Sequence, residues 1–423
     1  MENNLDQKKR TVNPLVSRRK LLAAIGGGGA ALAMEGMLGS SLLAEAMSGE
    51  KEKQTGKDKQ KGNAASQASL CEYNVMDYGA IGDGTTDDTG AIQAAIAACS
   101  AAGGGVVCFP AGTYLSGTIQ VGGHMKLRGV GQDVTSLKLK PGTNDALLVG
   151  TLTENVTISD MTLDGNASQQ TTGSTVIFWK CKRITIDHIK VINSHVIALN
   201  MSNVMASRIT RSHLKGTIGN TVISFSLDDP QYAEGNNWVM DNLIEDGYLD
   251  GIIYNTNRGV ISGNIIRNNG LVPNNTAGGV YINNKYGIVI SNNLIEGNDG
   301  NGIDIIDATE IISEGNWCVN NNSAGIMYAS VTNSQIIGNV CKNNGKAPAT
   351  GQDDGISILG NSHLVTITGN RCFDDQSVKT QRYGIHAIDT SHDLLITSNI
   401  LRGNLIGSLS TVGSSNVISS NLN

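Results

Sequence analysis

The sequence predicts an all-β fold: a single-stranded parallel β-helix, or solenoid, with a short capping helix at its N-terminal end. Three observations predict it, namely the composition, a recurring Asn motif and a recurring Gly-Ile motif. Of 423 residues, 52 are Gly and 43 are Asn, and only 4% are aromatic. Ordinary cores draw much of their buried area from aromatic side chains. A regular backbone arrangement must therefore organise this chain.

The Asn motif has a small or polar residue, then Asn, then an apolar residue. It repeats at intervals of 22–31 residues, at Asn242, Asn264, Asn293, Asn316, Asn339, Asn370, Asn399 and Asn421. Short units at such periods are typical of solenoids. Stacked coils lie about 4.8 Å apart, so equivalent residues form ladders. Asn and Gly suit the bends because both tolerate left-handed backbone.

The second motif is Gly followed by Ile or Val, and it falls between successive Asn motifs. It occurs at Gly251, Gly279, Gly302, Gly325, Gly355 and Gly384, each followed by residues of alternating character. Short runs with period two predict strands. Cys318, Cys341 and Cys372 share one column, two residues after the Asn. We interpret them as a buried ladder of thiols, with a disulfide or metal site as the alternative.

The first 69 residues are not part of the predicted fold. Residues 1–46 contain the twin-arginine motif Ser17–Leu22, a small apolar stretch and an Ala44-Glu45-Ala46 cleavage signal, which together indicate a bacterial export signal. Residues 47–69 lack aromatic and branched apolar side chains and are expected to be a disordered linker. We therefore expect a secreted or extracytoplasmic β-helix domain over residues 70–423, without stable membrane association once the signal is removed. The alternative is an uncleaved anchor.

Residues 73–118 combine several specific features. Asp77-Tyr78-Gly79-Ala80 and Gly82-Asp83-Gly84 precede a predicted helix that starts near Asp87 and Asp88, where either carboxylate can cap it. Its apolar face holds Ile92, Ile96 and Cys99, and the run Gly103–Gly105 ends it. A terminal helix of this kind seals the open end of a solenoid.

This stretch, together with Met161–Asn166, resembles the start of the pectate-lyase-like superfamily of right-handed β-helices. That superfamily includes polygalacturonases, rhamnogalacturonases, alginate C5-epimerases and phage tailspikes. The resemblance implies a right-handed coil and a protein that meets polysaccharide. It does not fix the reaction, since one scaffold carries many functions. Residues 195–201 read HVIALNM, so the Tyr-Gly-Phe-Asp-Pro-His-like strand of alginate epimerases is not found there.

Chemistry is expected on the strands that follow the Gly-Ile motif, where the residue after Ile should point outward. That column reads Ile253, Tyr281, Asp304, Met327, Ser357 and His386. The predicted catalytic residues are Asp304, Asp307 and Asp250. The predicted substrate-binding residues are Arg258, Tyr281, Lys285 and Tyr232. Two carboxylates could serve as acid and base in hydrolysis, or a cation could neutralise a uronate during β-elimination. Any one of these residues could instead be an ordinary solvated surface residue.

A second polar group is predicted at the acid pair Asp228 and Asp229. Oxygen-rich loops bind Ca²⁺, so these residues are the candidate metal ligands, although no cofactor is required by the motifs. The net charge of −6 argues against nucleic acid, whose binding domains usually carry a basic face.

The most specific function that these patterns indicate is cleavage of an acidic polysaccharide, a pectin- or alginate-like uronan, by hydrolysis or β-elimination in a groove on the β-helix. The alternative is a non-catalytic glycan-binding or structural surface protein. Polysaccharide is the expected partner, and the repeat fold is also compatible with a homo-oligomer.

Overall fold

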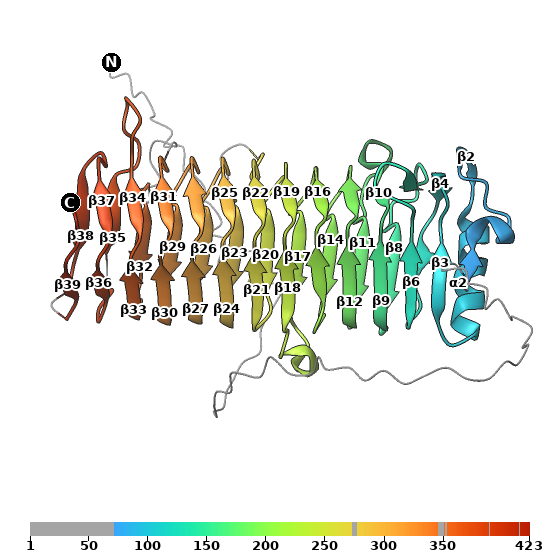
Figure 1. The fold of residues 1–423 in the computed structure, drawn as a ribbon, viewed down its shortest axis with the longest axis horizontal. Coiled ribbons are helices and arrows are strands. Elements are labelled where there is room, and N and C mark those ends of the chain that lie inside the picture. Colours follow the sequence, from blue (N-terminus) through green and yellow to red (C-terminus); the bar gives the residue numbers. More distant parts are fainter. Residues whose placement is uncertain (1–71, 273–276, 346–350, 352, 389, 414) are drawn as a thin grey trace, which may run out of the picture. The chain divides into compact units, whose positions relative to one another are not determined.

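The computed structural model describes residues 72–423 apart from 273–276, 346–350, 352, 389 and 414. The predicted export signal and linker lie outside the described residues. The described part is nearly all-β, and every strand pairing in it is parallel. Each full coil contributes one strand to each of three sheets, and the coils follow one another along the solenoid (Figure 1). The predicted parallel β-helix is confirmed.

Within the described residues the three sheets contain 14, 13 and 12 strands and are named A, B and C. Sheet A holds β1 (Tyr73–Asn74), β3 (Gly105–Cys108), β6 (Met125–Arg128), β9 (Glu154–Ser159), β12 (Lys182–Asp187), β15 (Arg208–Thr210), β18 (Asn237–Met240), β21 (Gly259–Ser262), β24 (Tyr286–Ser291), β27 (Thr309–Glu314), β30 (Thr332–Ile337), β33 (His363–Thr368), β36 (Leu395–Thr397) and β39 (Val417–Ser419). Sheet B holds β2 (Asp83–Asp87), β4 (Gly112–Ser116), β7 (Thr135–Leu139), β10 (Thr162–Asp164), β13 (Lys190–Ile192), β16 (His213–Lys215), β19 (Leu243–Glu245), β22 (Ile265–Arg267), β25 (Leu294–Glu296), β28 (Trp317–Val319), β31 (Val340–Lys342), β34 (Arg371–Phe373) and β37 (Ile400–Arg402). Sheet C holds β5 (Ile119–Gln120), β8 (Leu148–Thr151), β11 (Val176–Trp179), β14 (Leu199–Ser202), β17 (Ile223–Ser226), β20 (Ile252–Asn255), β23 (Val280–Asn283), β26 (Ile303–Ile306), β29 (Ile326–Ala329), β32 (Ile356–Leu359), β35 (Tyr383–Ala387) and β38 (Gly407–Thr411).

The core lies inside the coil and consists mainly of Ile, Val and Leu. Alternation along each strand places these residues inward, as in β12, where Ile184 and Ile186 are buried. Cys318, Cys341 and Cys372 pair in register in sheet B, and all three are free and buried. The hydrogen bond with Cys341 and then burial raise the pKa of the Cys318 thiol, and burial and then the hydrogen bond with Cys341 raise that of Cys372. The predicted core ladder of thiols is therefore confirmed.

The turns between sheets A and B contain the predicted Asn ladder, which runs from Asn242 to Asn421. The Oδ1 atom of Asn316 accepts the backbone N–H of Asn293 at 3.1 Å and its side-chain N–H at 2.9 Å. The Nδ2 atom of Asn316 donates to the Ile290 carbonyl at 2.8 Å. Each Asn thus satisfies backbone groups that a tight bend would otherwise leave unpaired.

A second ladder, which the sequence motif did not separate from the first, lies on the other side of sheet B. It consists of Asn269, Asn298, Asn321, Asn344, Gln381 and Asn404, joined side chain to side chain. One amide ladder therefore lies at the turns before the strands of sheet B, and the other lies at the turns after them.

One α-helix, α2 (Thr89–Ala101), lies at the N-terminal end of the solenoid, and its Ile92, Ile96 and Cys99 are buried as predicted (Figure 1). The short 3-10 helices are η1 (Val75–Tyr78), η2 (Ala167–Gln169) and η3 (Pro230–Tyr232). Asp87 accepts the N–H of Thr89 at 3.1 Å, whereas Asp88 accepts the N–H groups of Ile81 and Gly82. Of the two predicted caps, Asp87 bonds to the helix and Asp88 holds the preceding turn. No helix in the described ranges is long and apolar enough to cross a membrane.

Candidate functional site

The outer face of sheet C contains the predicted column of outward residues. Ile253, Tyr281, Asp304, Met327, Ser357 and His386 pair in register from β20 to β35. The middle of the column is nevertheless buried, with Tyr281 only 2% and Asp304 only 3% exposed. Met327 packs outside the coil with Ala324 and Leu359. The register was predicted, but the covering of this face by neighbouring side chains was not.

The three predicted catalytic carboxylates occupy different environments. Asp250 is buried and accepts the N–H of Gly278 at 2.7 Å, so it holds the segment that leads into β23. Asp304 is buried and accepts the Asn301 amide at 3.2 Å. Asp307 is exposed at the turn after β26, with a left-handed φ of 51°. The structure therefore places only Asp307 of the three on an open surface.

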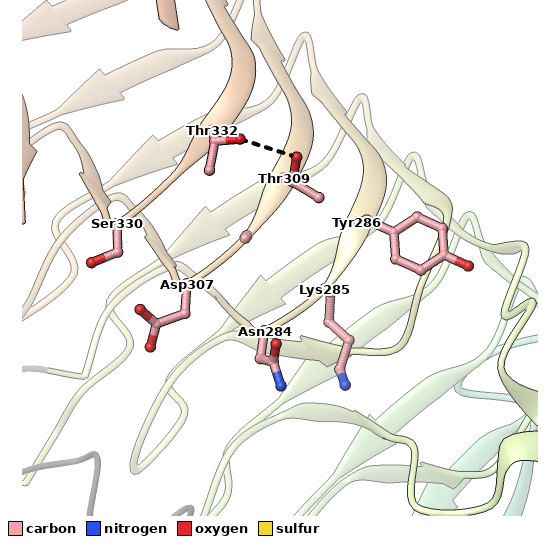
Figure 2. Close-up of a pocket in the computed structure, with 8 residues that line it drawn as sticks. Asn284, Lys285, Tyr286, Asp307, Thr309, Ser330 and Thr332 are labelled. Carbon is pink, nitrogen blue, oxygen red and sulfur yellow. Dashed lines mark hydrogen bonds between the residues drawn. The ribbon is translucent and has the colours of Figure 1, made fainter. Parts of the chain in front are cut away.

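Asp307 belongs to an open pocket at the turns between sheets C and A (Figure 2). The pocket has a volume of about 330 Å³ and is lined by Asn284, Lys285, Tyr286, Asp307, Ala308, Thr309, Ser330 and Thr332. Asn284 and Asp307 both have left-handed φ values, of 54° and 51°. In Figure 2 the side chains of Asn284, Lys285 and Asp307 extend to the same side, and Tyr286 lies apart from them. We call this the turn pocket.

Lys285 gives the turn pocket its distinctive electrostatics. Its side chain is partly buried, and burial lowers the pKa of its ammonium group. Among the residues that the structure describes, no carboxylate forms an ion pair with it. An ammonium group that has lost water and gained no ion pair is a favourable site for an anionic ligand. The hydroxyl groups of Thr309, Ser330 and Thr332 supply hydrogen-bonding partners beside it.

A row of cations and aromatic rings adjoins the turn pocket, and we call it the basic edge. The Arg258 guanidinium lies 5.8 Å from the ring centre of Tyr286 and is paired with Glu234. Further along, the ammonium of Lys182 lies 5.6 Å from the ring of Tyr232, and that of Lys180 lies 4.8 Å from Trp179. Tyr232 itself is buried, and its hydroxyl donates to the Lys180 carbonyl at 3.0 Å.

The insertion between β17 and β18 joins the two parts of the basic edge. It carries both Tyr232 and Glu234, which contact residues of different coils. Of the predicted binding residues, Arg258, Lys285 and Tyr232 therefore lie along the C-to-A turns. Tyr281 is separate, buried on the outer face of sheet C.

The predicted calcium ligands lie at the start of the same insertion. Asp229 forms an ion pair with Lys180 at 2.7 Å, which lowers the pKa of its carboxyl group. Asp228 accepts the side-chain amide of Asn203. No group of three or more His, Cys, Asp or Glu side chains suited to a metal ion occurs within the described ranges. Calcium binding at Asp228 and Asp229 stays a prediction.

A second polar cluster lies near the C-terminal coils, at Asp354, Ser357, Arg382, Tyr383 and His386. From the sequence, Asp354 is an acid in a loop, of the kind that is usually solvated, but the structure buries it completely. One sequence signal could have found it. Asp354 directly precedes the Gly355-Ile356 motif, a position that holds Asp also at 250 but Gly, Asn, Ala or Tyr in the other four coils.

Comparisons with known proteins agree with this architecture. A family model described as rhamnogalacturonase A/epimerase, pectate lyase-like, matches residues 73–304, and a right-handed β-helix model matches residues 250–423. Mannuronan C5-epimerase AlgE2 of Azotobacter vinelandii is 42% identical over 109 residues, which cover 22% of this chain and 11% of that protein. Alginate lyase 7 of the same organism is also 42% identical over 109 residues, which cover 22% of this chain and 13% of that protein. The match thus spans roughly a tenth of each curated relative's length.

Two solved structures share the fold over most of the chain. The A-module of the Azotobacter vinelandii mannuronan C5-epimerase AlgE4 superposes with a TM-score of 0.66 at 21% identity, covering 82% of this chain and all of the module. The Dettilon tailspike protein superposes with a TM-score of 0.63 at 18% identity, covering 80% of this chain and 68% of the tailspike.

Proposed function

The chain belongs to the rhamnogalacturonase A/epimerase, pectate-lyase-like family, and from this premise we propose that it acts on an acidic polysaccharide, a uronan, bound along sheet C and the basic edge. The observation that carries the proposal is the Lys285 ammonium in the turn pocket, which is partly buried and has no ion pair among the described residues. A uronan supplies one carboxylate on each sugar unit. A charge-assisted hydrogen bond to Lys285 is worth about 1.5–3 kcal/mol.

Other residues of the basic edge and of the turn pocket suit the remaining groups of a sugar. The exposed Trp179 and the partly exposed Tyr286 offer ring faces to the apolar side of a pyranose. Thr309, Ser330 and Thr332 offer hydroxyl groups to its hydroxyls. This combination of rings, hydroxyls and cations is what an acidic glycan requires.

Between the two reactions, the geometry favours β-elimination. Hydrolysis needs two accessible carboxyl groups about 5–10 Å apart, whereas Asp250 and Asp304 are both buried against backbone or amide partners. Elimination needs a cation to neutralise the uronate and a base to remove the C5 proton. Lys285 can bind the carboxylate of a uronate unit in the turn pocket, whereas the Arg258 guanidinium is already paired with Glu234.

We also propose that the protein works outside the cytoplasm, as its twin-arginine motif implies. Cys108 is disulfide-bonded, and disulfides persist mainly in oxidising compartments. Labelled protein recovered only from the cytoplasmic fraction of a bacterial host would contradict this proposal.

The decisive test incubates the purified protein with polymannuronate, polyguluronate, polygalacturonate and a neutral glucan. We expect absorbance from unsaturated uronate with at least one uronan and none with the glucan. New reducing ends without that absorbance would indicate hydrolysis instead. Binding without either product would support the alternative, a glycan-binding protein.

The Lys285→Met variant tests the site itself. Losing the ammonium should raise KM for the uronan about 10- to 100-fold, which corresponds to about 1.4–2.8 kcal/mol. The melting temperature should stay unchanged or rise slightly, because a desolvated charge without an ion pair is removed.

The matched control for this variant is Lys342→Met on sheet B, whose ammonium pairs with Asp375 at 2.8 Å. It should leave KM unchanged. Equal KM values for wild type and Lys285→Met would remove the turn pocket from the binding site.

A further inference from the structure

The cluster around Asp354 is built from two neighbouring strands of sheet C, β32 and β35, and from the residues that directly precede them. The Oδ2 atom of Asp354 accepts the Ser357 hydroxyl at 2.8 Å and lies 3.1 Å from Nδ1 of His386. Its Oδ1 atom accepts the N–H of Tyr383 at 3.2 Å and lies 3.8 Å from Nε of Arg382. Both carboxylate oxygens are therefore occupied, and Asp354 is held in one orientation.

These contacts assign the tautomer of His386. The Nη2 atom of Arg382 also lies near Nδ1, at 3.5 Å. The guanidinium nitrogens can only donate, and a protonated Nδ1 is also a donor, so these two atoms would not form a hydrogen bond. The shorter contact, with Asp354, therefore places a proton on Nδ1. In the neutral ring, Nε2 then carries the lone pair. None of the described residues bonds to Nε2, and the His386 side chain is 12% exposed.

Cationic and phenolic groups flank the imidazole. The Tyr383 ring lies 4.6 Å from the His386 ring, and the Arg382 guanidinium lies 5.6 Å from the centre of the Tyr383 ring. The Arg382 side chain is 21% exposed, so it can meet a ligand while its Nε faces Asp354. A base with a free lone pair thus stands beside an accessible cation.

The cluster and the turn pocket both adjoin sheet C, but Asp354 and Arg382 precede its strands whereas the turn pocket follows them. His386 belongs to the outer column of sheet C, and β23, β26, β29, β32 and β35 follow one another in that sheet (Figure 1). Four steps of about 4.8 Å separate the coil of Lys285 from that of His386, or roughly 19 Å along the axis of the solenoid. A glycan that crosses these coils would span both places.

We propose that His386, oriented by Asp354 and assisted by Arg382, is a proton-transfer site for a uronate unit; this rests on the proposed action on uronans. Arg382 binds the uronate carboxylate, and Nε2 of His386 takes the proton from C5. The electron pair of the C5–H bond forms the C4=C5 double bond as the C4–O bond breaks. The leaving oxygen takes a proton from solvent, and His386 later returns its proton to solvent.

The first experiment replaces the base in the full-length protein as His386→Gln. Product formation from the most active uronan of the panel should fall about 100-fold or more, while Kd for an oligouronate changes less than threefold. The control is His363→Gln, a partly buried histidine of sheet A that stacks on His392, and it should keep the wild-type rate. As a second readout, added imidazole should restore part of the rate of His386→Ala, which a purely structural histidine would not show.

The second experiment tests Asp354 as a positioning residue. Asp354→Asn keeps the shape of the side chain but removes the negative charge that stabilises the imidazolium formed when Nε2 of His386 takes the proton. We expect kcat to fall at least 10-fold with KM nearly unchanged and the near-UV circular dichroism unaltered.

The outcomes separate the two proposals. An active wild type whose His386→Gln variant keeps more than half of the rate would overturn the assignment of His386 and leave the action on uronans intact. A wild type that forms no product from any uronan would overturn both. A rate lost in His386→Gln and rescued by imidazole only in His386→Ala would support both.

Discussion

The two sides of the coil differ in how their residues repeat. Between sheets A and B, one Asn after another makes the same bonds, and the turn keeps the same short length from coil to coil. Around sheet C the connecting segments vary in length and composition, and they carry Lys285, Arg258 and the Asp354 cluster. The regular turns between sheets A and B stabilise the fold through the same hydrogen bonds in each coil. The segments around sheet C can carry polar residues that do not recur in the neighbouring coils.

Charge alone does not distinguish the two sides. On sheet B, the buried Glu245 bonds to Arg267, His213 and Lys215, which lie on strands of adjacent coils. On sheet C, the buried Asp354 precedes β32 and bonds to residues of β32 and β35. Arg267, Lys215 and the imidazole of His213 all bond to Glu245, so that its hydrogen-bond network is closed. We interpret Glu245 as structural and Asp354 as functional.

The largest expected loss of stability comes from a substitution in the Asn ladder between sheets A and B. Asn316→Ala removes four hydrogen bonds, with Asn293, Ile290 and Asn339, from a fully buried site. Each buried polar group that is left without a hydrogen-bond partner costs about 1–3 kcal/mol, although some of these groups retain a second partner. The free energy of unfolding should therefore fall by about 3–5 kcal/mol. Urea denaturation measures this change.

The matched control lies in the segment between sheets B and C. Asn322→Ala removes a bond to Asp299 from a partly buried residue and should cost less than about 1 kcal/mol. Equal costs for the two variants would contradict the division between a regular and an irregular side.

An intermediate loss of stability is expected when Glu245 is replaced. Burial raises the pKa of its carboxyl group, but hydrogen bonds from Arg267, His213 and Lys215 outweigh burial and bring it to about 2 from an ordinary 4.5. Since the pKa is depressed in the folded state, the stabilisation is full above pH 4.5 and is lost as the pH falls through 2. Glu245→Gln should therefore cost about 2–3 kcal/mol at pH 7 and little at pH 2.

Chemical denaturation of both proteins across that pH range measures the difference. A constant difference between pH 7 and pH 2 would show that Glu245 stabilises the fold by packing and not by its charge. Activity per folded molecule at pH 7 should match the wild type, in contrast to Asp354→Asn.

The smallest effect concerns the basic edge. Tyr286→Leu removes the ring beneath Arg258, and a partly exposed cation–π contact is worth about 0.5–1 kcal/mol. Affinity for an oligouronate should fall about two- to fivefold by calorimetry, with a melting temperature within a few degrees of wild type. Tyr78→Leu, in η1 near the N-terminal end, serves as the control. An unchanged affinity in Tyr286→Leu would place the glycan elsewhere on sheet C.

Periodic features could be predicted from the sequence. The bend ladder, the thiol column and the register of sheet C follow from residues that recur at one position of each coil, so the stacking of coils dictates their neighbours. The second ladder was harder to see. It lies five residues after the first, among other Asn residues, and Gln381 interrupts its pattern.

The surroundings of the polar residues could not be predicted in the same way. Asp304 belongs to the outward column as expected, yet it is buried and its carboxylate accepts the Asn301 amide. Asp354 and His386 meet across 32 residues through segments of unequal length. Such contacts depend on how individual loops pack, and a repeat spacing carries no information about loops that do not repeat.

The paired ladders along sheet B also bear on how proteins of this kind change in length. Each ladder amide bonds in the same way to the coil before it and the coil after it. A whole coil could therefore be duplicated or deleted with both ladders rejoined across the junction. Each such event would lengthen or shorten the outer face of sheet C by about 4.8 Å. The number of coils therefore sets the length of a ligand that this face can contact.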